Sequence, residues 1–310
     1  MSLKSVKSKI RSIDKSRQVT KAMESVSAVK MRRAQQRALQ VRPFARHALQ
    51  ILRNVTTSGD ASAHPLLSPR PVVKTCIVII GGDKGLAGSF GASLLRTTHT
   101  FITEHGLTRD NVALITVGRR VTEHFLQQQY NVLAMYEKWG DKPSYATITP
   151  LAHSIELLFK SGAYDEVHII FTNFVSTLSQ KVLVRQLLPI SFSAVEDAIT
   201  SIAPESGKFS EMNRDIKDDR TSEFMTYEPS REAVLTELIP LLFQIQIFHA
   251  LLESNASEHS ARMIAMKNAS DNASDIVKRL KQKFNKVRQA AITREVSEIV
   301  GGMESMKRSE

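Results

Sequence analysis

The sequence predicts a mixed α/β protein, in which long N- and C-terminal helices form an antiparallel coiled coil attached to an α/β domain with a mostly parallel sheet. Three observations predict this class. Residues 1–58 contain no glycine and only one proline. Residues 72–192 alternate short apolar runs with helix-compatible segments. Between Pro240 and Gly301 the chain runs for 60 residues without proline or glycine.

The first segment, residues 1–58, has the periodicity of a helix. Leu3, Val6, Ile10 and Ile13 follow one another at spacings of 3, 4 and 3, which places them on one helix face. A helix over the whole segment would be about 85 Å long at about 1.5 Å per residue. Its single proline is expected to bend the helix or to interrupt one backbone hydrogen bond.

The second segment, residues 72–192, predicts a Rossmann-like α/β domain. The apolar, β-branched run 72–80 ends in two glycines and is followed by a helix-compatible stretch. Strands that are apolar along their whole length and alternate with helices indicate a parallel sheet covered on both faces. The later elements are expected as helices at 92–103, 121–129 and 148–161 and as strands at 112–117, 130–136, 166–171 and 182–190.

The last segment, residues 229–303, is predicted to be one long helix, and residues 193–228 before it a linker or exposed loop. Two stretches of the helix carry apolar seams at alternating spacings of 4 and 3, separated by the small and polar residues 253–275. This middle stretch is expected to stay helical without anchoring a tight hydrophobic seam. A helix of this length needs a partner along its side, and the N-terminal helix is the natural antiparallel partner.

The net charge of +11 is confined to the N-terminal segment. Residues 1–58 carry 14 lysines and arginines against Asp14 and Glu24, whereas the remaining 252 residues carry 28 basic and 29 acidic residues. Three interpretations fit a basic helical segment: a mitochondrial transit peptide, a nucleic-acid-binding arm, or a coiled-coil face inside an acidic surrounding protein. The length of the segment opposes the first, and its lack of aromatic residues and its apolar stripe oppose the second.

No catalytic, metal-binding or cofactor-binding site is predicted. The nine histidines are dispersed, and the single Cys76 lies in an apolar run, which is typical of a buried structural thiol. The longest apolar stretch, residues 238–252, is shorter than the about 20 residues that cross a bilayer, so any membrane association is expected only through partners. The glycine-rich run 81–91 matches neither phosphate-loop motif, and a tight strand-to-helix turn is the simpler interpretation.

Motifs along the chain resemble, in the right order, those of the F-type ATP synthase gamma family. Towards the ends of the chain they are QVTKAM at 18–23, KMRRAQ at 30–35, RPFA at 42–45, ASEHSARM at 256–263, NKVRQAAIT at 285–293 and EIVGG at 298–302. In the middle they are DKGLAG at 83–88, TLSQ at 177–180 and YEP at 227–229. Ala87 stands where the family commonly has cysteine, so no thiol role is carried over.

The resemblance implies a non-catalytic rotor subunit. In this family the terminal helices form an antiparallel coiled coil inside a ring of three alpha and three beta subunits. The α/β domain is the foot, which rests on the membrane c-ring beside the epsilon subunit. Ion-driven rotation of the c-ring then changes the conformations of the beta sites, where ATP and magnesium bind. The alternative that the residues leave open is a basic coiled-coil nucleic-acid-binding protein with an α/β domain.

The resemblance also implies contact residues. Arg288, Gln289 and Thr293 match the positions that hydrogen-bond the acidic catch loop of the beta subunit. Three more residues are expected to face the beta lever region, namely Lys21, Met23 and Arg33. Tyr227 and Glu228 match the foot, which contacts the c-ring and epsilon. The match at the N-terminus predicts a peripheral protein on the cytoplasmic side of a bacterial plasma membrane.

Overall fold

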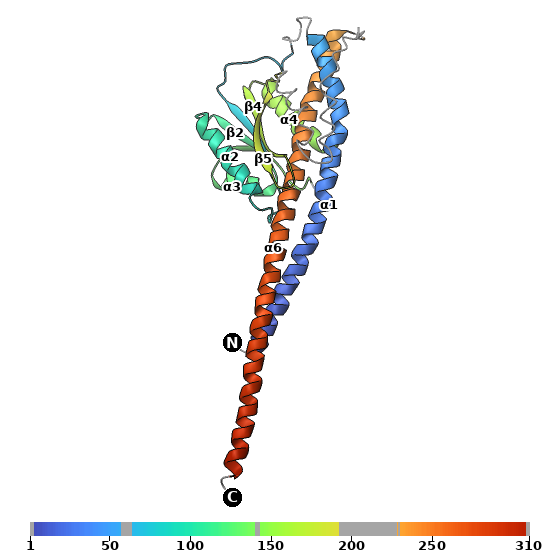
Figure 1. Ribbon diagram of the computed structural model, residues 1–310. Coiled ribbons are helices and arrows are strands. Elements are labelled where there is room, and N and C mark those ends of the chain that lie inside the picture. Colours follow the sequence, from blue (N-terminus) through green and yellow to red (C-terminus); the bar gives the residue numbers. More distant parts are fainter. Residues whose placement is uncertain (1–2, 57–63, 140–142, 192–227, 229, 308–310) are drawn as a thin grey trace. The chain divides into compact units, whose positions relative to one another are not determined.

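The computed structural model describes residues 3–56, 64–139, 143–191, 228 and 230–307 (Figure 1). Two long helices, α1 (Leu3–Thr56) and α6 (Arg231–Lys307), enclose an α/β region in the sequence. The elements of this region are β1 (Thr75–Ile80), α2 (Phe90–Glu104), β2 (Val112–Val117), α3 (Arg119–Gln127), β3 (Val132–Tyr136), α4 (Tyr145–Lys160), β4 (Glu166–Phe174) and β5 (Gln180–Leu188).

The five strands form one sheet in the order β3-β2-β1-β4-β5. The pairs β1–β2, β1–β4 and β2–β3 are parallel, and β5 is added to β4 as an antiparallel edge strand. This topology and the two long helices confirm the predicted fold class. The run at 182–190 is indeed a strand, although it begins earlier, at Gln180.

Side chains of β1 alternate between two hydrophobic clusters, one on each face of the sheet. Cys76, Val78 and Ile80 belong to a cluster that includes residues of α4 and α6, whereas Ile77 and Ile79 belong to a cluster with α2 and α3. All six residues of β1 are buried because helices cover both faces, which explains why every residue after Thr75 is apolar. The α2 and α3 helices lie together over one face in Figure 1.

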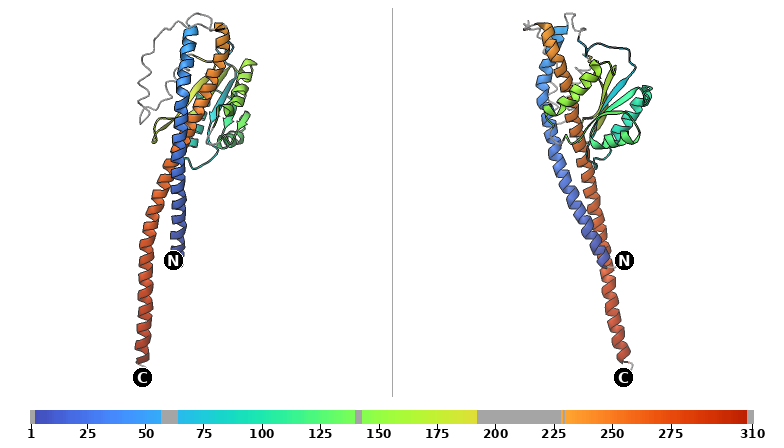
Figure 2. Two further views of the ribbon diagram at one scale, coloured as in Figure 1. Left: turned by 90° about the vertical axis from the view of Figure 1, so that its right-hand side faces the viewer. Right: turned by 180° about the vertical axis from the view of Figure 1, so that it is seen from behind.

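The chain divides into two compact units. One comprises Ser27–Arg262, and the other comprises Met1–Val26 with Met263–Glu310. Within each unit a part of α1 and a part of α6 run in opposite directions, as the two views of Figure 2 show. In the second unit Val6 and Val277 are buried, whereas the described α6 side chains after Ala291 are exposed.

Both long helices contain residues that commonly end a helix. Pro43 was expected to bend α1 or to interrupt one of its hydrogen bonds, and α1 remains a single helix through it. Likewise α6 includes Pro240 near its start and Gly301 and Gly302 near its end. Packing of the helix side outweighs the local cost of Pro240, which follows the buried Ile239, whereas Gly301 and Gly302 lie where the α6 side chains are exposed.

One window of 18 residues in α6 is apolar enough to cross a membrane by length and composition, with a mean hydropathy of 1.6. Of this window, 61% is buried inside the structure. Burial of this extent is typical of a core helix, and α6 supplies Leu242, Phe243 and Ile247 to the hydrophobic cluster under the sheet.

Candidate functional site

The carboxyl ends of β1, β2 and β4 form the edge at which open α/β sheets bind ligands. β1 lies between β2 and β4, so the chain leaves β1 towards one side and later returns on the other. Such a topological switch point opens a crevice outside the strand ends. The glycine-rich turn after β1 lies here, and its Gly81 N–H donates to the Val117 carbonyl at 2.8 Å.

In this chain the crevice is occupied by α6. The Ser254 hydroxyl donates to the Ile80 carbonyl at 3.1 Å, and the Ser257 hydroxyl donates to the Thr172 carbonyl at 3.0 Å. These bonds join one helix face to the ends of β1 and β4. Both serines are buried, and their carbonyl partners are backbone groups with fixed positions.

Two further polar contacts extend the same helix face along β4 and the turn after it. The Phe174 N–H donates to the Glu253 carboxylate at 2.9 Å, and the Ser260 hydroxyl donates to the Thr177 carbonyl at 2.7 Å. We call the α6 residues with these contacts, together with Glu258 and Arg262, the polar seam: Glu253, Ser254, Ser257, Glu258, Ser260 and Arg262.

The polar seam ends in an ion pair that closes over the glycine-rich turn. The Arg262 guanidinium donates to the Glu258 carboxylate one helical turn earlier. It also points at the carbonyls of Lys84 and Gly85, each at 3.4 Å. A Cβ added to Gly82 would lie 2.8 Å from the Glu258 carboxylate, so only glycine admits this approach. Side-chain exposure is 8% for Arg262 and 12% for Glu258.

The opposite side of the turn is held by Asp83. Its two carboxylate oxygens accept hydrogen bonds from the backbone N–H groups of Arg119 and Lys138, each at 3.0 Å. Arg119 begins α3, where a carboxylate also interacts favourably with the helix dipole. The glycine-rich turn is therefore bonded both to its own domain and to α6.

This geometry determines what the crevice can do. Polar groups at the switch point are paired with α6, and a carboxylate rather than a phosphate lies against Gly82. Among the described residues, no group of three or more histidine, cysteine, aspartate or glutamate side chains is arranged to hold a metal ion. The edge is built as an intramolecular helix-binding site.

A second contact of α6 lies nearer its start. The Tyr145 hydroxyl on α4 donates to the Gln244 side chain, and the Tyr145 ring packs near Phe248 at 6.2 Å between ring centroids. Partial burial raises the pKa of Tyr145, so the hydroxyl keeps the proton that it donates. This contact and the polar seam hold α6 to the α/β region at two separate places.

The contact residues predicted from the sequence lie in different parts of the chain. Arg288, Gln289 and Thr293 are all exposed on the last third of α6. Gln289 and Thr293 are four residues apart and share a helix face. On α1, Lys21 forms an ion pair with Glu24 at 3.1 Å. Two other predicted residues on α1 are Met23, which is half-buried, and Arg33, which is exposed.

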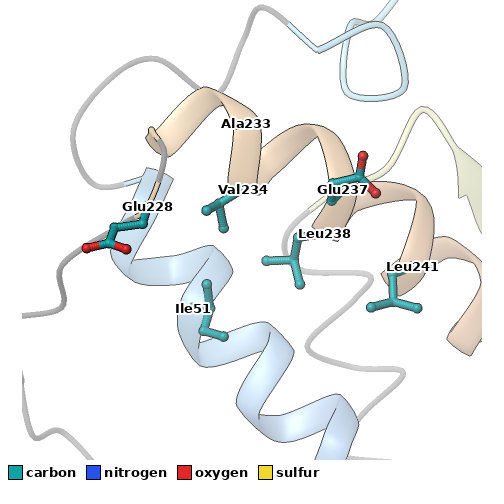
Figure 3. Close-up of a pocket in the computed structure, with 7 residues that line it drawn as sticks. All are labelled: Ile51, Glu228, Ala233, Val234, Glu237, Leu238 and Leu241. Carbon is teal, nitrogen blue, oxygen red and sulfur yellow. The ribbon is translucent and has the colours of Figure 1, made fainter.

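Of the two predicted foot residues, Tyr227 lies outside the described residues. Glu228 is exposed and lines a groove of about 470 Å³ between the end of α1 and the start of α6 (Figure 3). The groove is largely apolar, and the remaining lining residues are Ile51, Ala233, Val234, Glu237, Leu238 and Leu241.

The sequence alone did not indicate a role for the polar seam. Residues 253–275 were identified only as a small and polar stretch between two apolar seams. The signal that marks the site is polar side chains recurring at helical spacing inside a buried helix, as at Glu253, Ser257 and Ser260. Such a face requires polar partners, and the strand ends and glycine-rich turn supply them.

The fold defines a class of protein in which the C-terminal helix occupies the ligand-binding edge of the α/β domain. Comparison with known proteins identifies the family. A family model described as ATP synthase matches residues 2–306. The chain belongs to the ATP synthase gamma chain family, since it is 38% identical over 300 residues to an ATP synthase gamma chain from Heliobacterium modesticaldum. The match covers 97% of each chain. This finding confirms the predicted family, and it offers no support for the nucleic-acid-binding alternative.

Solved structures share the fold at lower identity. A central stalk and c-ring structure of the Tetrahymena thermophila mitochondrial ATP synthase matches with a TM-score of 0.57 and 24% identity, over 81% of this chain and 99% of that chain. A structure of the Euglena gracilis mitochondrial ATP synthase that includes the c-ring matches with a TM-score of 0.63 and 18% identity, over 98% and 94%. At these identities the likeness supports the fold.

Proposed function

We propose that this chain is a non-catalytic rotor shaft that couples rotation of a membrane c-ring to ATP synthesis or hydrolysis in an alpha3-beta3 hexamer. The observation that carries the proposal is the 38% identity to a gamma chain over 97% of both chains. One continuous helix before the α/β domain in the sequence and another after it suit a shaft with a foot. The partners are the alpha, beta and epsilon subunits and the c-ring.

Each segment of the chain has its own part in this proposed function. Residues 1–58 and 229–303 form the coiled-coil shaft within the hexamer, while residues 72–192 form the foot, with residues 193–228 as a linker or foot loop. The 14 basic residues of the first segment suit an acidic hexamer interior, since opposite charges favour association. The complex is held at the cytoplasmic side of a bacterial plasma membrane, and the chain reaches the membrane only through its partners.

Contacts to the beta subunits use exposed residues of both helices. Arg288, Gln289 and Thr293 bind the acidic catch loop, because a guanidinium pairs with carboxylates through several donors at once. Lys21, Met23 and Arg33 face the beta lever region. Their exposed or half-buried positions support such roles.

The foot contact uses Tyr227 and Glu228. Glu228 is exposed beside an apolar groove, which supports a role in binding another subunit. The c-ring and epsilon are the partners that a foot on the membrane side of the hexamer would meet. Rotation of the c-ring would then reach the shaft through this contact.

The experiment that tests the proposal combines Arg288→Glu with Gln289→Ala in the chain reconstituted with alpha and beta subunits. Reversing the charge opposes the acidic loop, so we expect ATP turnover of the complex to fall while the isolated chain keeps its helix content. Arg279→Glu with Gln282→Ala is the matched control, because both residues are exposed on α6 and carry the same side-chain types. Unchanged turnover in the first variant would refute the catch contact. Failure of the native chain to bind alpha and beta subunits would refute the rotor function itself.

A further inference from the structure

We propose that the polar seam and the glycine-rich turn form the joint that transmits torque between the α/β domain and the shaft, with Glu258 and Arg262 as its positioning residues. This inference rests on the proposed rotor function and adds the place where the foot grips the shaft. It also assigns a purpose to a crevice that in other α/β folds holds a ligand.

The joint is needed because the apolar contacts of α6 are not directional. Residues such as Leu242 and Phe243 hold the helix against the sheet, and a hydrophobic contact depends on buried area rather than on angle. A helix held in this way alone can turn about its axis or slide. Hydrogen bonds prefer a narrow range of angles and distances, so they resist both motions.

The geometry of the polar seam fits this demand. Its bonds reach four separate backbone places: the end of β1, the end of β4, the turn at 177 and the turn at 82–85. A small rotation of α6 would break these bonds together, leaving the buried serine hydroxyls and the Glu253 carboxylate without their backbone partners and moving Arg262 away from the carbonyls of the turn. The ion pair between Glu258 and Arg262 would be kept, because both residues lie on α6. Buried polar groups that lose their hydrogen-bond partners are costly, and this cost opposes the rotation.

Two features single out Glu258 and Arg262 within the seam. Their pair is shielded from water, so it is less weakened by screening than an exposed ion pair. Their partner is the turn that Asp83 also fixes to α3 and to the segment after β3. Force applied to the α/β domain therefore reaches α6 through bonded groups on both sides of the turn.

The position of the pair along the chain supports the same role. The compact unit that contains the α/β domain ends at Arg262, and α6 continues as one helix to Lys307. Torque delivered at the joint would thus pass into the shaft along a continuous helix. No loop between the joint and the shaft has to carry it.

The test compares two activities of Arg262→Ala and of Glu258→Gln. The first is ATP hydrolysis by the soluble complex with alpha and beta subunits, which needs the shaft but not the foot. The second is ATP-driven ion pumping by the complete membrane complex, which needs the joint. We expect soluble hydrolysis to be retained and the ratio of ion pumping to hydrolysis to fall severalfold in both variants.

The matched control is Lys160→Ala with Glu156→Gln. These residues form an ion pair at the same spacing of four on α4, at 3.5 Å, with the lysine exposed and away from the seam. Its pumping ratio should equal that of the native chain. If soluble hydrolysis and pumping fall together in the Arg262 and Glu258 variants, or if pumping is unaffected, the joint is refuted. If the native chain does not assemble with alpha and beta subunits, it is the rotor function that fails.

A covalent replacement of the joint keeps the inference testable if loss of the ion pair also lowers stability. In Gly82→Cys with Glu258→Cys, the two thiols would replace the contact between the turn and the Glu258 carboxylate, which lies 2.8 Å from a Cβ at position 82, and oxidation would link the turn to α6. Cys76 will not compete, because it is fully buried. We expect coupled pumping to be low in the reduced complex and restored after oxidation. Equal coupling in the two states, or failure of the disulfide to form, would overturn the inference.

Discussion

The Glu258 carboxylate lies directly over Gly82, so that a Cβ on this glycine would be 2.8 Å from it. Gly82→Ala therefore forces the carboxylate away from the turn or shifts the turn itself. We expect the free energy of unfolding to fall by about 1–3 kcal/mol, the range found for overpacked sites. Denaturant unfolding followed by circular dichroism measures it.

Gly91→Ala is the matched control for this substitution. Gly91 lies in the first turn of α2, and nothing within 4 Å would meet its Cβ. Alanine there should leave stability unchanged or raise it by up to about 1 kcal/mol. Equal losses at the two glycines would contradict the close approach of Glu258.

Glycine is required more strictly at position 118 than at position 82. Its φ is +100°, and a Cβ would lie 2.8 Å from the carbonyl carbon and oxygen of Gly81. Backbone atoms cannot move aside as a side chain can, so Gly118→Ala should cost roughly 2–5 kcal/mol from the left-handed backbone and the clash together. Gly106→Ala isolates the first contribution, because its φ is +61° and nothing lies within 4 Å. A similar loss of unfolding free energy for both variants would show that the clash is absent.

His99 on α2 and His124 on α3 share a hydrogen bond between their Nε2 atoms at 3.1 Å. Burial, and then the charge of His124, lowers the pKa of His99. Since the folded pKa is depressed, this pair stabilises the fold above the ordinary value of 6.5 and loses that contribution as the pH falls below it. His124→Ala should raise the pKa of His99 while leaving it depressed by burial. Titration of the ring protons by NMR would reveal it, and an unchanged His99 pKa would contradict the charge interaction.

Cys76 is buried in β1, and burial raises the pKa of its thiol from 9.0 to about 12. The folded protein should therefore not react with an aromatic disulfide reagent at pH 8, because the thiolate is the reactive form. Denaturant should release one equivalent of reactive thiol. The raised pKa contributes stability that is complete below pH 9.0 and is lost progressively as the pH rises towards about 12. Rapid labelling of the native protein would contradict this burial.

Much of the fold follows from local patterns that the sequence displays. β1 was predictable because all of its residues after Thr75 are apolar, a pattern typical of a strand that is covered on both faces. The edge strand β5 was predictable as a strand, but its antiparallel direction depends on the short connection after β4, which lets the chain fold back beside it. The continuation of α6 through Gly301 was not predictable, because glycine is a common helix terminator.

The candidate contact residues likewise fall into two groups, those that the sequence indicated and those that only the structure revealed. Arg288 and Gln289 were assigned by resemblance, and the structure adds only that they are exposed on α6. Ser254 and Ser257 carried no recognisable signal alone, since isolated serines are common on helices. Their importance comes from the backbone carbonyls of β1 and β4 that they meet across more than eighty residues of sequence.

By itself, the sequence determined the long helices, the alternation of the α/β domain and the concentration of basic charge in residues 1–58. These properties depend on neighbours within a few turns or strands, which periodicity and composition record. Only the tertiary structure decided that α6 fills the crevice at the switch point and that Glu258 and Arg262 close over Gly82. Hydrogen bonds between distant segments depend on where the whole chain brings their atoms, and no local pattern encodes that placement.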